Sequence, residues 1–248
     1  MPVKRSTNRA KSELAMPEFI HSQPRNSNAN WRQSKWLMLG EFAIGVLICI
    51  THVRHFNVLG KTPWLLLLGS ISLWVRKIGW RGIGLTRYRN WKITLGLGVA
   101  AGVALETFEL FVSQPVLVQV LGKQPDLEGF RTLTGNLKLT LIFLALAWIV
   151  AALGEEMVYR GYLMNRVADL LNRSPRAWTF SLIIVNVGFG LAHAQQGLTG
   201  VIDEGLMGLL LGLMYLGTGR NLSVPIVAHG VQDSIDFILM FLGKYPGM

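Results

Sequence analysis

Two adjacent glutamates, Glu155 and Glu156, follow an apolar run at residues 141–153 that contains no charged side chain. A charge in the middle of a bilayer costs roughly 2.5–3.5 kcal/mol even on lenient insertion scales, so such residues usually serve a function. Glu156 and Arg160 are four residues apart, on one helical face with the acid before the base. We therefore predict that this pair has a positioning role. Glu155, which shares the neighbouring face with Tyr159, is then left for chemistry, unless the tract is a salt-bridged helix end at the membrane surface.

Two histidines in later apolar segments each have a partner four residues away on the same helical face. Phe189 precedes His193, and Asp233 follows His229. A glutamate and a histidine together can hold and deprotonate a water molecule. A second histidine with a polar neighbour can stabilise the oxyanion that forms when this water attacks a carbonyl group. If the helices converge, the tracts predict hydrolysis of an amide bond. Taken singly, each histidine also fits a hydrogen-bonded residue of an ordinary bundle.

The same side chains leave open whether a metal takes part. Glu155, His193 and His229 are a conceivable set of ligands for a divalent ion such as zinc. The HExxH motif of many zinc peptidases is absent, and so is the GxSxG motif of serine hydrolases. The single cysteine, Cys49, excludes an intramolecular disulfide and a cysteine-rich metal cluster. No cofactor is therefore certain, and zinc is the one to consider.

The composition is that of an integral membrane protein. Of the 248 residues, 51% are hydrophobic and 15% are charged, and the mean hydropathy is +0.39. A helical span needs about 20 mainly apolar residues. Candidate segments are residues 36–53, 58–75, 93–121, 137–165, 175–197, 200–217 and 222–243. We predict an all-α, polytopic transmembrane helical bundle of about seven spans, and about six to eight are compatible with the length.

Basic residues outnumber acidic ones, 24 to 14, for a net charge of +10. They cluster in the N-terminal tail and in short loops, above all in residues 76–92, which contain no acid. This distribution follows the positive-inside rule and indicates contact with anionic lipid rather than with nucleic acid. It predicts a cytoplasmic N-terminus in a multi-pass protein of a bacterial plasma membrane or an organelle membrane. Residues 1–34 are predicted to be a disordered basic cytoplasmic tail, and residues 35–248 a single transmembrane domain.

Most of the 14 acidic residues fall inside the predicted spans. There each needs a proton, a hydrogen bond, a metal or a water-filled cavity. Arg160 is the only basic residue well inside a span. The other lysines and arginines of the spans lie at their ends, where they can snorkel to the surface: Lys61, Lys138 and Arg176.

The three tracts together resemble the motifs of the CPBP family, which contains CAAX proteases and bacteriocin-processing enzymes and is also called Abi. The family motifs run EExxxR, FxxxH and HxxxN/D on successive membrane helices. In this chain they read Glu155-Glu156-Met157-Val158-Tyr159-Arg160, Phe189-Gly190-Leu191-Ala192-His193 and His229-Gly230-Val231-Gln232-Asp233. The resemblance covers residues 137–243, which would form the catalytic core.

The resemblance implies an intramembrane endopeptidase of the glutamate type, long described as a metalloprotease. Glu155 with His193 would activate the water, and His229 with Asp233 would form the oxyanion side of the site. The implied catalytic residues are Glu155, Glu156, Arg160, His193, His229 and Asp233, and the residues expected to bind substrate are Phe189 and Tyr159. Eukaryotic relatives cleave prenylated CAAX proteins, which implies a membrane-anchored peptide or protein as substrate.

Two other functions fit the residues. A non-catalytic membrane scaffold or bacteriocin-immunity protein would keep the fold and tolerate Glu155→Gln. A proton-coupled transporter would use the carboxylates as a relay, and Glu106 and Glu109 would then matter as much as Glu155. An endopeptidase is expected to lose activity on Glu155→Gln and keep its fold.

Overall fold

The computed structural model describes residues 31–53 and 60–248, and every regular element in these two ranges is helical. This finding confirms the predicted all-α class. Most of the predicted tail at residues 1–34 lies outside the described residues, and Trp31–Gln33 forms a short 3-10 helix, η1.

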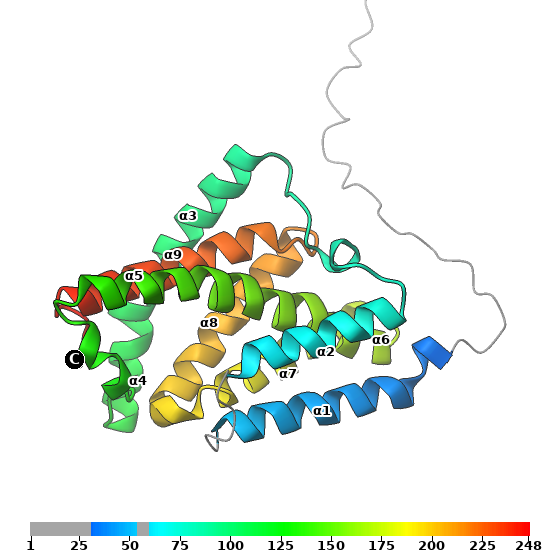
Figure 1. The fold of residues 1–248 in the computed structure, drawn as a ribbon, viewed down its shortest axis with the longest axis horizontal. Helices are drawn as coiled ribbons and strands as arrows, with labels where there is room; N and C mark the ends of the chain where they lie inside the picture. Colours follow the sequence, from blue (N-terminus) through cyan, green and yellow to red (C-terminus); the bar gives the residue numbers. More distant parts are fainter. Residues whose placement is uncertain (1–30, 54–59) are drawn as a thin grey trace, which may run out of the picture. The chain divides into compact units, whose positions relative to one another are not determined.

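The helices follow one another along the chain with short connections (Figure 1). The α-helices are α1 (Lys35–Val53), α2 (Lys61–Val75), α3 (Trp91–Phe108), α4 (Gln114–Leu121), α5 (Leu137–Leu146), α6 (Met164–Leu170), α7 (Pro175–Leu191), α8 (Gly197–Gly217) and α9 (Ser223–Phe241). Two π-helices, η3 (Glu109–Ser113) and η5 (Ala147–Leu163), continue α3 and α5 without a break. The 3-10 helices are η2 (Trp80–Ile83), η4 (Glu128–Leu133) and η6 (Ala194–Gln196).

Five helical stretches in the described part of the chain are long and apolar enough to cross a membrane. They are Lys35–His52, Trp91–Leu121, Leu137–Leu170, Ala194–Gly217 and Ser223–Phe241. The other two predicted spans correspond to α2 and α7, which have 15 and 17 residues. The polytopic helical bundle is therefore confirmed, with a helix at each of the seven predicted segments.

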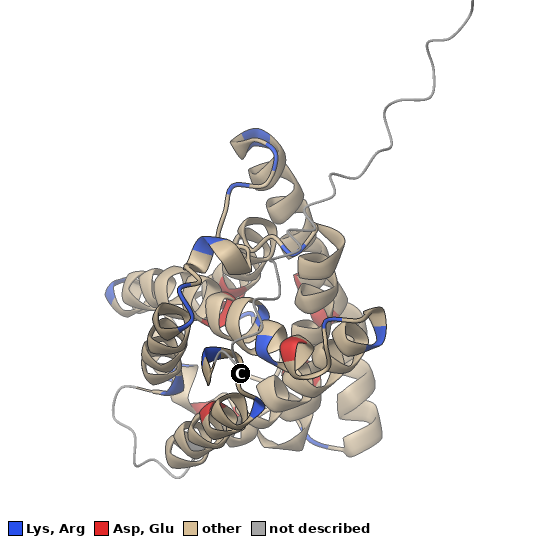
Figure 2. Cartoon of the chain, turned by 90° about the vertical axis from the view of Figure 1, so that its right-hand side faces the viewer, with Lys and Arg blue, Asp and Glu red and all other residues tan. Residues whose placement is uncertain are grey.

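The bundle carries apolar side chains on the outside and polar ones within. Trp36, Phe111 and Ile149 are 82%, 75% and 64% exposed, whereas Arg160 and Glu156 are fully buried. Figure 2 shows that acidic residues lie on helices within the bundle, while many basic residues lie at helix ends and in loops. This distribution is suited to a hydrocarbon environment, where large apolar side chains face lipid at no cost and charged ones must be enclosed.

The helix formed by α5, η5 and α6 runs between α9 on one side and α2 on the other (Figure 1). α9 also packs closely against α3, because Gly102 leaves room for it. A Cβ atom at position 102 would lie only 2.5 Å from the carbonyl oxygen of Ala228. Small residues at such crossings are typical of membrane helix pairs. The packing brings α2, η5, α7 and α9, which carry the polar residues of interest, into one region.

Candidate active site

Glu155 and Glu156 lie in the π-helix η5, not in an ordinary α-helical turn. Both side chains are buried, with 7% and 0% exposure. π-Helical segments are rare and are found frequently at functional sites. The sequence pattern located the pair correctly inside a membrane helix, but it did not predict the π-helical geometry.

Glu156 is held by a cation and by a histidine. Arg160 Nη1 donates a hydrogen bond to Glu156 Oε1 at 2.8 Å, and His229 Nδ1 lies 2.9 Å from the same oxygen. The other end of the Arg160 guanidinium donates from Nη2 to Asn186 Oδ1 at 3.1 Å and to the carbonyl oxygen of Gly208 at 2.7 Å. One buried arginine thus joins η5 to α7 and α8, and its carboxylate partner joins η5 to α9.

His229 has a carboxylate at each ring nitrogen. In addition to the Glu156 contact at Nδ1, Nε2 lies 3.5 Å from Asp233 Oδ1. The Asp233 side chain is 20% exposed and that of His229 is 10% exposed, so this edge of the ring is the more open one. A ring that is anchored at Nδ1 has a fixed orientation, which leaves Nε2 as the nitrogen with the looser partner.

Glu155 also has a cationic partner. Its Oε1 lies 3.3 Å from Lys61 Nζ and accepts a hydrogen bond from Thr62 Oγ1 at 3.1 Å. Lys61 Nζ also lies 3.3 Å from His193 Nε2. The expectation that Lys61 snorkels at a span end is therefore wrong, whereas the chemical role predicted for Glu155 stays a prediction. Lys61 is only 6% exposed, because the first turn of α2 packs against η5.

The approach of α2 depends on the residue before the two glutamates. A Cβ atom at Gly154 would lie 2.8 Å from Thr62 Cγ2, closer than real side-chain contacts allow. Glycine at this position lets the first turn of α2 come near enough for Thr62 to reach Glu155. Gly60, which precedes α2, has a positive φ of 76°, a conformation that glycine adopts without strain.

Phe189 packs between the residues around Glu155 and those around Glu156. Its ring lies 4.8 Å from that of Tyr159 and 4.7 Å from that of His193, measured between centroids. The Arg160 guanidinium lies over the same ring at 4.8 Å. Phe189 and Tyr159 are each 2% exposed and belong to the largest apolar cluster. The structure thus places both residues in the packed core, and their contact with substrate stays a prediction.

All the residues singled out by the motifs lie in this region, on η5, on α9, at the carboxyl-terminal end of α7 and, for His193, in the turn between α7 and η6. The sequence interpretation missed the partners that hold them: Lys61, Thr62, Asn186 and the Gly208 carbonyl. Asn186 could have been identified from the sequence, because it is a single amide side chain in an apolar segment. Lys61 and Thr62 lie 93 or more residues from the groups they contact, so no local spacing could reveal them.

The side chains do not fit the zinc site that the sequence left open. In the residues described, no three His, Cys, Asp or Glu side chains are arranged to hold a metal ion. The Lys61 ammonium lies 3.3 Å from Glu155 and from His193, where an ion shared by the two would have to bind. His229 Nδ1 is engaged by Glu156. A divalent cation at this position would meet a positive charge at contact distance.

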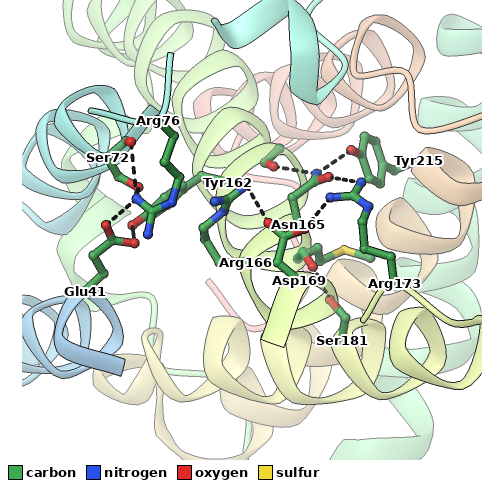
Figure 3. Close-up of polar contacts among 12 residues, drawn as sticks. Glu41, Ser72, Arg76, Tyr162, Asn165, Arg166, Asp169, Arg173, Ser181 and Tyr215 are labelled. Atoms are coloured by element: carbon green, nitrogen blue, oxygen red, sulfur yellow. Dashed lines mark hydrogen bonds and ion pairs between the residues drawn. The ribbon is translucent and has the colours of Figure 1, made fainter. Parts of the chain in front are cut away.

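A second polar network surrounds the carboxyl end of η5 and the start of α6 (Figure 3). Glu41 of α1 accepts hydrogen bonds from Arg76 Nη1 at 2.5 Å and from the Tyr162 hydroxyl at 3.1 Å. Asn165 donates to the Tyr215 hydroxyl at 2.8 Å. These contacts tie η5 and α6 to α1, α2 and α8, and so they fix the helix that carries Glu155.

A further group of carboxyl side chains lies where α3, η3, α8 and α9 meet. Ser113 Oγ donates a hydrogen bond to Asp203 Oδ1 at 2.5 Å, and Gln232 Nε2 donates one to Glu109 Oε2 at 2.5 Å. No donor among the described residues reaches Glu106, although it is 2% exposed. The group consists of Glu106, Glu109, Asp203 and Asp236 and forms no ion pair with a lysine or arginine of the described ranges.

Comparison with known proteins agrees with the motif assignment. A family model described as Type II CAAX prenyl endopeptidase Rce1-like matches residues 137–235. No curated protein and no solved structure matches the chain significantly. The matched segment contains all the motif residues from Glu155 to Asp233, but not Lys61. The predicted resemblance is therefore confirmed: residues 137–235 of this integral membrane protein are similar to the Rce1-like type II CAAX prenyl endopeptidases.

Proposed function

We propose that the protein is an intramembrane endopeptidase that hydrolyses a peptide bond of a membrane-associated protein or peptide. The observation that carries this proposal is that Glu155 and His193 both contact the Lys61 ammonium, next to the histidine–carboxylate unit of His229 and Glu156. These carboxylates and histidines all lie in the segment that matches the Rce1-like family. A CAAX-like protein tail anchored in the membrane is the substrate class that the family match supports.

Glu155 is the proposed general base. Its Oε1 is occupied by Lys61 and Thr62, whereas Oε2 accepts no hydrogen bond from the described residues. Oε2 is therefore the oxygen to which a water molecule binds. Glu155 takes one proton from this water while the water oxygen forms a bond to the carbonyl carbon. The proton then passes to the amide nitrogen, the C–N bond breaks, and the products are a carboxylic acid and an amine.

His229 is the proposed donor to the oxyanion. Glu156 fixes the ring through Nδ1, and Arg160 fixes Glu156. Because Nδ1 donates to Glu156, Nε2 can donate only from the doubly protonated ring, whose positive charge Glu156 and Asp233 stabilise. The Nε2–H of this ring, 3.5 Å from Asp233, then faces the developing charge on the substrate oxygen. A donor held in place before the reaction stabilises that charge without the cost of reorganisation. The role proposed for Asp233 is to orient this edge of the ring.

The membrane placement is proposed from the charge distribution. The basic loop at residues 76–92 and the basic N-terminus face the cytoplasm and meet the phosphates of anionic lipid. The membrane is a bacterial plasma membrane or an organelle membrane.

The test is cleavage in proteoliposomes. Purified wild type, Glu155→Gln and Glu128→Gln are each given a library of membrane-tethered peptides, with and without a chelator. Glu128 is an exposed glutamate in η4 and serves as the matched control. We expect cleavage by wild type and by Glu128→Gln, and a loss of about 10²–10⁴-fold in Glu155→Gln. Cleavage by Glu155→Gln at the wild-type rate would contradict the proposal. No cleavage by any folded variant would favour the scaffold or immunity function.

A proton-coupled transporter is the second candidate, favoured by one observation. The described residues place no lysine or arginine in an ion pair with this cluster of carboxylates, in contrast to Glu155 and Glu156. The cluster consists of Glu106, Glu109, Asp203 and Asp236. A transporter would show pH-driven substrate flux in liposomes that Glu106→Gln abolishes.

A further inference from the structure

Lys61 is a buried cation that belongs to none of the three motifs and lies outside the segment matched by the family model. It is the first residue of α2, and its side chain is 7% exposed. Its ammonium nitrogen lies 3.3 Å from Glu155 Oε1 and 3.3 Å from His193 Nε2. Burial of a lysine this completely is rare and requires partners of this kind.

Both contacts involve the groups to which water activation is assigned. His193 Nδ1 lies 2.9 Å from the carbonyl oxygen of Phe189, which can only accept a hydrogen bond. The proton of the neutral ring is therefore on Nδ1, and Nε2 is the acceptor that faces Lys61. Glu155 is held through Oε1 by Lys61 and Thr62 together. The ammonium thus fixes the base and its histidine from one point.

The same point is where a metal bound by Glu155 and His193 would lie. The positive charge of Lys61 opposes a second cation there. Unlike a bound ion, a lysine does not exchange with the solution and is unaffected by chelators. Its three N–H groups also allow it to bridge two acceptors at once.

We propose that Lys61 is a positioning residue of the active site, a cation supplied by the chain that holds Glu155 and His193 together in the place a metal would take. This inference rests on the proposed function. It adds that α2, through Lys61, holds Glu155 in a fixed orientation. With Oε1 held, Oε2 faces the water in one geometry. Because Gly154 allows the close approach of Thr62, the first turn of α2 forms part of the site.

The first test measures kinetics on a membrane-tethered peptide that wild type cleaves. The variants are Lys61→Met, Lys61→Ala and Lys61→Arg, with the exposed Lys138→Met as control. We expect Lys61→Met to lower kcat by about 10²-fold, the cost of a small misplacement of a reacting group, with little change in KM. Lys61→Arg keeps the charge and loses less. Methylammonium added to Lys61→Ala restores part of the activity, an effect that a merely structural lysine would not show.

The second test does not depend on activity. Thermal unfolding in detergent is measured for Lys61→Met, Glu155→Gln and the double variant. Each single change leaves one charged or polar partner buried without the other. We therefore expect the double variant to lower Tm by less than the two single changes together. Lys138→Met combined with Glu155→Gln should give additive Tm losses.

The two tests separate the inference from the proposed function. If wild type cleaves and Lys61→Met cleaves equally well, the inference fails and the proposed function stands. Additive Tm losses for Lys61→Met and Glu155→Gln would also overturn it, because the ion pair would then be absent. Loss of wild-type cleavage in chelator, restored by zinc, would overturn the claim that the lysine replaces a metal. If wild type cleaves none of the peptides, the proposed function fails and the positioning role of Lys61 fails with it, while the Tm data still report the ion pair.

Discussion

The bundle contains two groups of buried carboxylates that differ in their partners. Glu155 and Glu156 each face a cation, Lys61 at 3.3 Å and Arg160 at 2.8 Å. The group between α3, η3, α8 and α9 faces hydroxyl and amide donors or none: Glu106, Glu109, Asp203 and Asp236. Burial alone therefore does not distinguish a reactive carboxylate. The fixed positive charge, and the histidine held next to it, mark the first group as the one with a defined geometry.

The difference has an energetic consequence. Removing one member of a buried ion pair leaves an uncompensated charge, which costs about 3–5 kcal/mol. When a carboxyl group accepts no hydrogen bond and forms no ion pair, its replacement by an amide of the same shape breaks no ion pair. The ion-paired group should therefore respond strongly to substitution, and the other group weakly.

Arg160→Met should lower the free energy of unfolding by about 3–5 kcal/mol, because Glu156 would remain buried without its cation. The change would also free Asn186 and the Gly208 carbonyl. Thermal or denaturant unfolding in detergent measures the loss, with Arg160→Lys as the variant that keeps the charge. A change below about 1 kcal/mol would show that the pair does not organise the core.

Gly154→Ala should cost about 1–3 kcal/mol, the usual effect of overpacking. The added Cβ would meet Thr62 Cγ2 at 2.8 Å and push the first turn of α2 away from Glu155. We expect kcat for peptide cleavage to fall as well. Gly188→Ala in α7 is the control, because a Cβ there meets no atom within 4 Å. Equal effects of the two alanines on stability and on kcat would argue against the close approach of α2.

Glu106→Gln should change the free energy of unfolding by less than about 1 kcal/mol, since no donor of the described residues is lost. Cleavage should continue at nearly the wild-type rate. The matched comparison is Glu156→Gln, which removes the negative charge opposite Arg160 and His229 and should be clearly less stable. Comparable losses in both variants would remove the distinction between the two groups.

Much of the site could be predicted from local spacing, and the rest could not for physical reasons. Apolar segments identify membrane helices because a span needs a minimum length of apolar chain. A separation of four residues correctly paired Glu156 with Arg160 and His229 with Asp233, since such residues share a helical face. The order of the motifs also indicated the family whose model matches residues 137–235.

The contacts between distant segments escaped prediction. Lys61 pairs with Glu155 and His193 only because α2 packs against η5, and nothing near Lys61 in the chain indicates this. The bond from His229 to Glu156 spans 73 residues. Helix α7 has 17 residues and ends at Leu191, before the end of the predicted segment 175–197, because a turn follows it. Sequence patterns indicate which residues share one face of a helix. The site depends on which helices pack against each other, and local spacing does not indicate that.

The π-helical geometry of η5 restricts how the length of this part of the chain can vary during evolution. At its end the Met164 amide donates to the Tyr159 carbonyl, five residues earlier instead of four. Deleting a single residue ahead of Glu155 would turn the two sides of the deletion relative to each other by roughly a quarter of a turn. Substitutions of one apolar side chain by another would be tolerated at lipid-facing positions such as Ile149, which is 64% exposed. Insertions and deletions would not, so natural variants of η5 are expected to differ in side chains and to agree in residue number.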